Sequence, residues 1–356
     1  MSQPETATPW PRPTPAGVGV VVAAASLLIL RPPGALADLL LLGLASLALV
    51  AWALAWRAAR QAPGVVRRLP PVATRGELVS VIHEVEHRGT LALRAVWVRE
   101  LEPPRGATFF AGLAPGQRAA AATRVWAGQR GRLRLPGVQL QVGDPFGLFE
   151  TRLRRELPGE VLVRPRPRRA AGRLVLEARS ARGRDPGEGW TSVREWRPGD
   201  SRRDVSWRLT ARRGWPVLLL RPPRPEQVAL LALDRAPVSE RGAARFERAV
   251  ALAAGIGLLL LEEGRRVRFL APGEEDALDL ELRGRAGGQR LLEALALLAP
   301  DRSGLQAGLP AGAALEQAIV VSPGGSPAVR GAALVVDEEG RMVGRARAAG
   351  PAGWRS

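Results

Sequence analysis

The chain has 356 residues, enough for a membrane segment and two soluble domains of ordinary size. It contains no lysine, which excludes P-loop ATPases and lysine Schiff-base enzymes, and no cysteine, which excludes disulfides, thiol catalysis and cysteine-ligated zinc. The net charge is +18, but the arginines are spread along the chain and interleaved with acidic residues, so we expect no nucleic-acid partner.

Two uncharged stretches near the start predict a membrane anchor. Residues 16–30 and 39–56 are apolar, and a spanning helix needs about 20 such residues, with a range near 17 to 25. The second stretch qualifies alone, whereas the first is short. The Pro- and Gly-rich break between them predicts a tight hairpin of two transmembrane helices within residues 1–60. Three tryptophans suit a membrane interface: Trp10, Trp52 and Trp56.

The charges around the second stretch predict its orientation. The connecting loop holds Arg31, which Asp38 balances. Four arginines follow the stretch: Arg57, Arg60, Arg67 and Arg68. The positive-inside rule therefore places the soluble body in the cytoplasm, attached to the inner membrane. An alternative takes the first stretch as a signal peptide that is cleaved near residues 35–37, and the body stays inside under either interpretation.

Residues 65–160 alternate apolar and polar side chains between Gly and Pro turns, which predicts an antiparallel β-sandwich. Within it, residues 83–87 read H-E-V-E-H and match the H-E-x-x-H motif, whose histidines bind zinc from one face of a helix. The flanking valines alternate with polar residues, so we expect a strand with two ordinary histidines. A zinc hydrolase, with Glu100 or Glu102 as a further ligand, remains an alternative.

The most distinctive sequence lies in and before a linking segment at residues 161–226. Residues 144–150 read D-P-F-G-L-F-E, and residues 194–220 contain R-E-W-R-P-G-D followed by S-R-R-D-V-S-W-R-L-T-A-R-R. In the second run, Pro198-Gly199 predicts a turn, and Asp200 is expected to cap a following helix. Val205 and Leu209 would give that helix an apolar pair.

Three further charged residues of this run, Arg203, Asp204 and Arg212, are expected to form a buried ion-pair and hydrogen-bond network. One interpretation is structural, with the network joining the sandwich to the next domain. The other is a surface that contacts a partner.

Residues 227–343 alternate buried strands with apolar-faced helices, which predicts a parallel α/β sheet with its ligand edge at the carboxyl ends of the strands. The tail at residues 344–356 is rich in Ala, Gly and Arg, and we expect it to be flexible.

The two distinctive runs together resemble a bacterial family called domain of unknown function 58. The second run matches the family's pattern at nine positions: Arg194, Gly199, Asp200, Arg203, Val205, Trp207, Thr210, Ala211 and Arg212. Trp196 stands where the family usually has tyrosine. The resemblance implies a hairpin anchor, a β-rich region and a fold like that of a von Willebrand factor A domain, acting with MoxR-type AAA+ ATPases.

The implied von Willebrand factor A fold also implies a place for a metal ion. Such domains commonly hold Mg²⁺ with a D-x-S-x-S run after the first strand, because hard oxygen ligands suit that ion. Here the corresponding positions are Asp234, Ala236 and Val238, and Ser322-Pro323 follows a later strand. We therefore expect a degenerate metal site, with Asp234 as a salt-bridge partner or as a hydrogen-bond acceptor at the strand end.

The leading hypothesis is a noncatalytic, membrane-tethered scaffold or adaptor without a cofactor, which binds a MoxR-type AAA+ ATPase through the edge near Asp234. The candidate residues for partner binding or for the structural network are Arg194, Trp196, Gly199, Asp200, Arg203, Asp204, Trp207, Arg212 and Asp234. Two alternatives are a structural envelope protein that needs no ATPase, and the zinc hydrolase.

Overall fold

A computed structural model divides the chain into two compact units, Met1–Arg164 and Pro165–Ser356. The structure describes residues 10–30, 35–102, 106–169, 192–198, 200–201, 205–220, 228–235, 240–273, 277–301, 318–323 and 334–345. The division into two units is coarser than the five segments expected from the sequence, whose boundaries stay a prediction.

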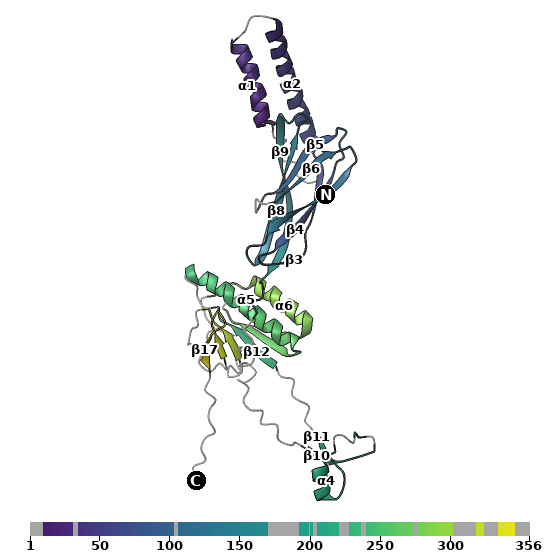
Figure 1. The fold of residues 1–356 in the computed structure, drawn as a ribbon, viewed down its shortest axis with the longest axis vertical. Coiled ribbons are helices and arrows are strands. Elements are labelled where there is room, and N and C mark those ends of the chain that lie inside the picture. The colour runs from purple at the N-terminus through teal and green to yellow at the C-terminus, as the bar shows by residue number, and fades with distance from the viewer. Residues whose placement is uncertain are drawn as a thin grey trace. The chain divides into compact units, whose positions relative to one another are not determined.

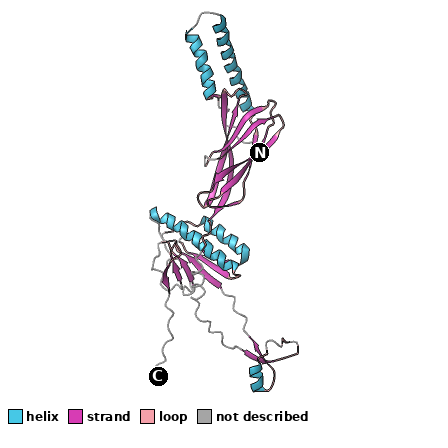
Figure 2. Ribbon diagram, viewed as in Figure 1, coloured by secondary structure: helices cyan, strands magenta, loops and turns pink. Residues whose placement is uncertain are grey.

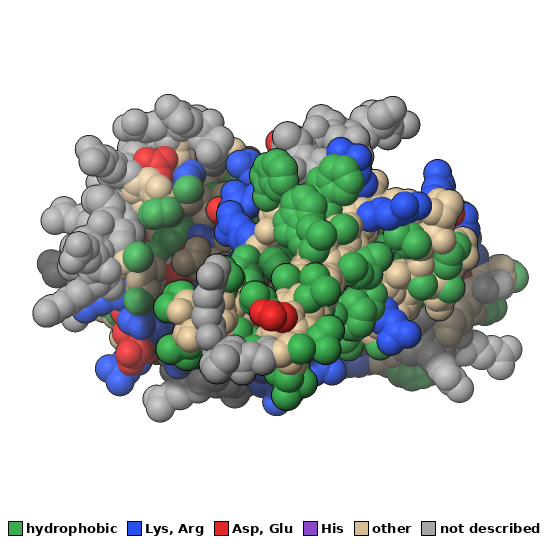
Figure 3. Space-filling model, turned by 90° about the horizontal axis from the view of Figure 1, so that it is seen from above, with side chains coloured by type: hydrophobic (Ala, Val, Ile, Leu, Met, Phe, Trp, Pro, Cys, Tyr) green, Lys and Arg blue, Asp and Glu red, His purple; other side chains and the backbone are tan. Residues whose placement is uncertain are grey.

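Unit 1 begins with two apolar helices that lie side by side, α1 (Pro15–Leu30) and α2 (Ala35–Arg60), shown at one end of this unit in Figure 1. Most of their apolar side chains are exposed, and Figure 3 shows hydrophobic side chains gathered at this end. Among the described residues, α2 alone is long and apolar enough to cross a membrane, while α1 is shorter. A pair of transmembrane helices therefore stays a prediction.

The rest of unit 1 consists of two β-sheets. One has the order β1-β9-β8-β5-β6, with β3 parallel to β9, and the other has the order β2-β4-β7. All other pairings are antiparallel, as expected. The strands of the first sheet are β1 (Arg12–Pro13), β3 (Val72–Thr74), β5 (Leu93–Glu100), β6 (Ala107–Leu113), β8 (Gly131–Gly143) and β9 (Phe149–Arg164). Those of the second are β2 (Gly64–Arg68), β4 (Leu78–Glu86) and β7 (Arg118–Trp126).

Two clusters of buried apolar side chains lie between the sheets, and α2 reaches into the larger one. Val85 of β4 and Val98 of β5 belong to the same buried cluster, which places apolar side chains of both sheets in contact. Ala58 and Ala59, in the last turn of α2, are members of that cluster too. Because part of the helix is packed in the sandwich core, α2 and the sandwich are held together without a flexible connection.

Unit 2 contains an α/β sheet whose strands follow the order β14-β13-β12-β15-β16-β17. They span β12 (Val228–Leu233), β13 (Arg266–Ala271), β14 (Leu278–Leu282), β15 (Ala318–Val321), β16 (Leu334–Val336) and β17 (Met342–Arg345). The four central strands are parallel, as predicted. The edge strands β14 and β17 were not predicted. Each is antiparallel to its neighbour, because a short connection joins the two strands in the chain.

Two helices, α5 (Glu240–Glu262) and α6 (Gly284–Leu297), pack on one face of this sheet (Figure 2). Side chains that alternate along β12 divide between the faces, since Leu231 joins the cluster under the helices and Ala232 joins a smaller cluster on the other face. If the six strands are numbered 1 to 6 along the chain, their order across the sheet is 3-2-1-4-5-6. The order in which the chain adds strands therefore changes direction between β12 and β15. In open α/β sheets, ligands bind at such a reversal, at the carboxyl ends of the strands.

Unit 2 also contains a short antiparallel pair, β10 (Ser192–Glu195) and β11 (Val217–Leu220), with α4 (Trp207–Arg213) between them in the chain. We call these three elements, together with the described residues between them in the chain, the α4 module.

Candidate functional site

An ion pair closes the turn that follows β10 in the α4 module. Arg194 donates from both terminal nitrogens to the two carboxylate oxygens of Asp200, at 2.7 and 2.8 Å, and the backbone N–H of Arg197 donates to the same carboxylate at 2.9 Å. The indole N–H of Trp196 donates to the carbonyl of Asp200 at 3.2 Å. The hydrogen bonds from Arg194, and then from Arg197, lower the pKa of Asp200 to about 2.

The expectation that Asp200 caps a helix was wrong, because its carboxylate binds Arg194 and its own turn. Helix α4 begins at Trp207, and its N-cap residue is Ser206, whose side chain makes no capping bond. Val205 lies before the helix, buried and bridged to Leu218 of β11, so it does not form the predicted helical pair with Leu209.

Hydrogen bonds of the Thr210 side chain hold α4 against β11. The hydroxyl of Thr210 donates to the carbonyl of Ser206 at 2.9 Å and accepts from the N–H of Val217 at 3.1 Å. Gly214 ends the helix in the left-handed conformation, with φ of 79°, which glycine adopts without steric cost. The helix is therefore attached to β11 through Thr210, although none of its residues is buried.

The outer surface of the α4 module carries exposed aromatic and basic side chains. Trp207 is 69% exposed, and Trp215 is exposed as well. Three arginines of α4, Arg208, Arg212 and Arg213, are also exposed. The exposure of Arg212 contradicts the buried network predicted for it, and the other members of that network, Arg203 and Asp204, lie outside the described residues together with Gly199.

A second polar cluster lies at the carboxyl edge of the α/β sheet, where the strand order reverses. The hydroxyl of Ser322, after β15, donates to the carboxylate of Asp234, after β12, at 2.9 Å, and both residues are buried. The N–H of Asp234 donates to the carbonyl of Val321 at 2.8 Å. The predicted role of Asp234 as a hydrogen-bond acceptor at the strand end is confirmed, while Ala236 and Val238 lie outside the described residues.

Sequence reasoning missed Arg235, whose guanidinium is buried at the same edge. Its Nε donates to the carbonyl of Ala299 at 2.7 Å, and one terminal nitrogen lies 3.8 Å from a carboxylate oxygen of Asp301. A Cβ at Gly273 would overlap that nitrogen and the Asp301 carboxylate, so glycine leaves room for the pair. The sequence signal was an arginine two residues after a buried strand, which is too common to identify such a site.

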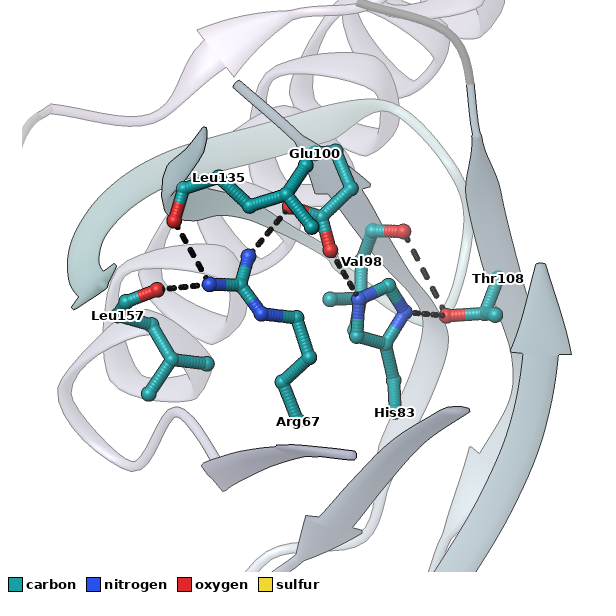
Figure 4. Close-up of polar contacts among 7 residues, drawn as sticks. All are labelled: Arg67, His83, Val98, Glu100, Thr108, Leu135 and Leu157. Carbon is teal, nitrogen blue, oxygen red and sulfur yellow. Dashed lines mark hydrogen bonds and ion pairs between the residues drawn. The ribbon is translucent and has the colours of Figure 1, made fainter. Parts of the chain in front are cut away.

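The first four residues of the H-E-V-E-H run lie on β4, as predicted, with His87 directly after it, and His83 joins a buried polar network between the sheets (Figure 4). The Nε2 of His83 lies 2.8 Å from Glu100, and its Nδ1 lies 3.0 Å from the hydroxyl of Thr108. The other oxygen of Glu100 accepts from Arg67 at 2.6 Å. Arg67 also donates to the carbonyls of Leu135 and Leu157.

This network corrects one expectation about its residues. Arg67, which was counted among the charges beside the anchor, is 2% exposed in its side chain and is paired with a fully buried Glu100. His83 lies on a strand, as predicted, and its ring joins the two sheets. The motif's helical geometry is absent, and no group of three or more His, Cys, Asp or Glu among the described residues is placed to hold a metal ion.

The D-P-F-G-L-F run forms a tight turn between β8 and β9, which we call the 144–149 turn. The carboxylate of Asp144 accepts from the N–H groups of Phe146 and Phe149, at 2.7 and 2.5 Å. Gly147 has φ of 74°, a conformation that favours glycine. Leu148 and Phe149 pack with Ala51 and Ala55 of α2. The run therefore attaches the helices to the sandwich.

A family model described as "Protein of unknown function DUF58" matches residues 192–324. This match supports the DUF58 family. It begins at the first residue of β10 and extends past β15, so the DUF58 match includes both the α4 module and the Asp234–Ser322 pair. No curated protein matches the chain.

Proposed function

We propose that this protein is a noncatalytic, membrane-tethered adaptor that binds a MoxR-type AAA+ ATPase in protein assembly or remodelling. The observation that carries the proposal is the exposed surface of the α4 module, where Trp207 and Trp215 stand beside three arginines. Tryptophan and arginine are the residue types that most often dominate binding energy at protein interfaces. The choice of ATPase comes from the family resemblance.

The contacts that shape the module support this role. The Arg194–Asp200 pair closes the turn before α4, and Gly214 ends the helix, so little conformational entropy is lost when a partner binds. The surrounding arginines favour an acidic partner surface, because complementary charge speeds encounter and suppresses wrong partners.

The sheet edge near Asp234 provides the second proposed contact. We propose that the α/β domain is von Willebrand factor A-like, which its 3-2-1-4-5-6 strand order supports, with a degenerate metal site. In this site the Ser322 hydroxyl donates to the Asp234 carboxylate. The next residue in the chain, Arg235, contributes a buried positive charge. Because Asp234 is itself buried, it organises the edge and does not present its carboxylate to the partner.

The proposed anchor is the α1–α2 hairpin in the inner membrane, with the body in the cytoplasm. Exposed apolar side chains on both helices support it, since such a surface is stable in lipid and costly in water. Arg57 and Arg60, exposed at the end of α2, support the cytoplasmic location of the body.

The test is affinity purification of the tagged full-length chain from gently solubilised native membranes, with and without ATP, followed by mass spectrometry. Binding of the purified MoxR-type ATPase to the chain in nanodiscs gives the affinity. We expect Trp207→Ala to weaken binding by more than about tenfold, a loss typical of an interface hot spot. Trp126→Ala is the matched control, because this tryptophan is 50% exposed but lies on β7 of unit 1.

Loss of binding in Trp207→Ala, with normal binding in Trp126→Ala, supports the adaptor. Equal binding by both variants argues against the α4 surface. If no AAA+ ATPase co-purifies or binds under either nucleotide condition, the ATPase partner is wrong and a structural envelope role becomes the better hypothesis.

A further inference from the structure

An exposed aromatic side chain projects from the 144–149 turn at the foot of the two apolar helices. Phe146 is 55% exposed, and its backbone N–H donates to the Asp144 carboxylate, which positions the turn that carries the ring. An exposed phenyl ring adds nothing to the stability of the sandwich through burial. The residues around Phe146 therefore indicate which surface the ring contacts.

The 144–149 turn is attached to the first residues of α1. Thr14 donates from its hydroxyl to the carbonyl of Gly147 at 2.6 Å and from its N–H to the carbonyl of Leu148 at 2.8 Å. Thr14 also begins the helix, since its own oxygens accept from the N–H groups of Gly17 and Val18. A Cβ at Gly17 would overlap the Leu148 carbonyl, so the turn and the helix are in close contact. Phe146 thus lies level with the start of α1.

A stack of tryptophans occupies the same end of the helices. Trp10 is 72% exposed and stacks on Trp52 at 5.7 Å between ring centroids, and Trp52 stacks on Trp56 at 6.3 Å. The guanidinium of Arg60 lies 3.5 Å from the centre of the Trp56 ring. Aromatic rings backed by arginine are typical of the boundary between lipid tails and headgroups.

The length of α2 places this stack at such a boundary. From Leu39, the first residue of the uncharged stretch, to Trp56 the helix rises roughly 26 Å at 1.5 Å per residue, close to the roughly 30 Å thickness of a bilayer's hydrocarbon core. If Leu39 lies at one face of the hydrocarbon, then Trp56 lies near the other. The 144–149 turn, which packs against Ala51 and Ala55, stands at that same depth.

We propose that Phe146 and Trp10 insert into the headgroup region of the leaflet next to the sandwich, so that this domain rests on the membrane surface. The occupant of this aromatic surface is the lipid bilayer, because Trp10 stacks on Trp52 of α2 and the turn that carries Phe146 packs against Ala51 and Ala55 of the same apolar helix. The inference rests on the proposed membrane anchor. It adds that the sandwich is held at a fixed depth by two aromatic contacts outside the spanning segments.

The absence of cysteine from the chain makes the test direct, since one introduced cysteine carries the only label. Full-length Phe146→Cys, bearing an environment-sensitive fluorophore, is reconstituted in lipid nanodiscs. Leu49→Cys reports on the anchor, because Leu49 is exposed in the middle part of α2. Trp126→Cys is the water-exposed control, because Trp126 lies at the end of the sandwich away from α2. Trp126 pairs with Leu78 at one end of β4, whereas Glu86 at the other end of β4 pairs with Gly64, near the end of α2.

We expect the label at Phe146 to emit at shorter wavelength than the label at Trp126, with severalfold weaker quenching by aqueous iodide and stronger quenching by lipids that carry a quencher near the headgroup. Iodide quenching at Phe146 equal to that at Trp126, with Leu49 protected, overturns the inference and leaves the anchor intact. If iodide also reaches the label at Leu49, both the anchor and the inference are wrong.

Discussion

Replacing Glu100 by alanine tests whether the network in Figure 4 controls the stability of the sandwich. The carboxylate of Glu100 bridges Arg67 at 2.6 Å and His83 at 2.8 Å, and the side chains of Glu100 and His83 are fully buried. Its removal leaves the Arg67 guanidinium with two backbone carbonyls but without a counter-charge. It also leaves the ring of His83 without its acceptor.

The expected cost follows from these two losses. Breaking a buried ion pair by removing one partner costs about 3–5 kcal/mol, because an uncompensated charge stays buried. A buried N–H that loses its acceptor costs roughly 1–3 kcal/mol more, although costs within one network are not additive. Domains of this size are stable by about 5–15 kcal/mol in total. Glu100→Ala therefore brings the sandwich close to the limit of folding.

Hydrogen–deuterium exchange with mass spectrometry, on the full-length chain in nanodiscs, measures this effect locally. Peptides from β4 and β5 are expected to exchange roughly two to three orders of magnitude faster in Glu100→Ala, since each tenfold change corresponds to about 1.4 kcal/mol. Glu160→Ala is the matched control, because it breaks the exposed Arg132–Glu160 pair of the same sandwich. Such pairs contribute about 0–1 kcal/mol.

A second substitution separates charge burial from lost packing. Arg67→Met in the Glu100→Ala background removes the stranded charge and keeps an apolar side chain, so we expect it to recover part of the lost protection. If the double variant exchanges faster than Glu100→Ala alone, or if Glu100→Ala exchanges no faster than Glu160→Ala, the reasoning about the buried charge is refuted.

Three further predictions concern the other contacts. The pKa of Asp200 is lowered from 3.8 to about 2, so the contribution of its carboxylate to the stability of the turn is complete above pH 3.8 and is lost as the pH falls toward 2. A carboxyl NMR titration should show this low pKa, and Arg194→Ala should return it toward 3.8. Gly17→Ala is expected to push α1 off the carbonyl of Leu148 and to speed amide exchange in the 144–149 turn at least severalfold; unchanged exchange would contradict the close contact. Ser322→Val removes a buried donor to a carboxylate and should destabilise β12 and β15 by about 1.5–3 kcal/mol in local exchange, with β17 as the internal reference.

Several features could be predicted from the sequence because they repeat with a regular period. Alternation of apolar and polar residues at Val79, Val81, His83 and Val85 indicated a strand, and the structure buries these four side chains on one face. The uncharged run inside α2 indicated a helix that suits a membrane. The alternation of strands and helices in residues 227–343 indicated the parallel centre of the α/β sheet.

The pairing of charged residues could not be predicted, because it leaves no period in the sequence. Arg67, His83 and Glu100 come from three strands, and they meet because the two sheets face each other in one particular register. Asp200 suited a helix cap by residue type, but Arg194 lies within reach of its carboxylate. Periodicity and local backbone preference predicted many of the elements from sequence alone, although not the edge strands β14 and β17. Tertiary structure decided which charges became partners, because residues far apart in the sequence meet only in the folded chain, and a buried charge is stable only beside a counter-charge.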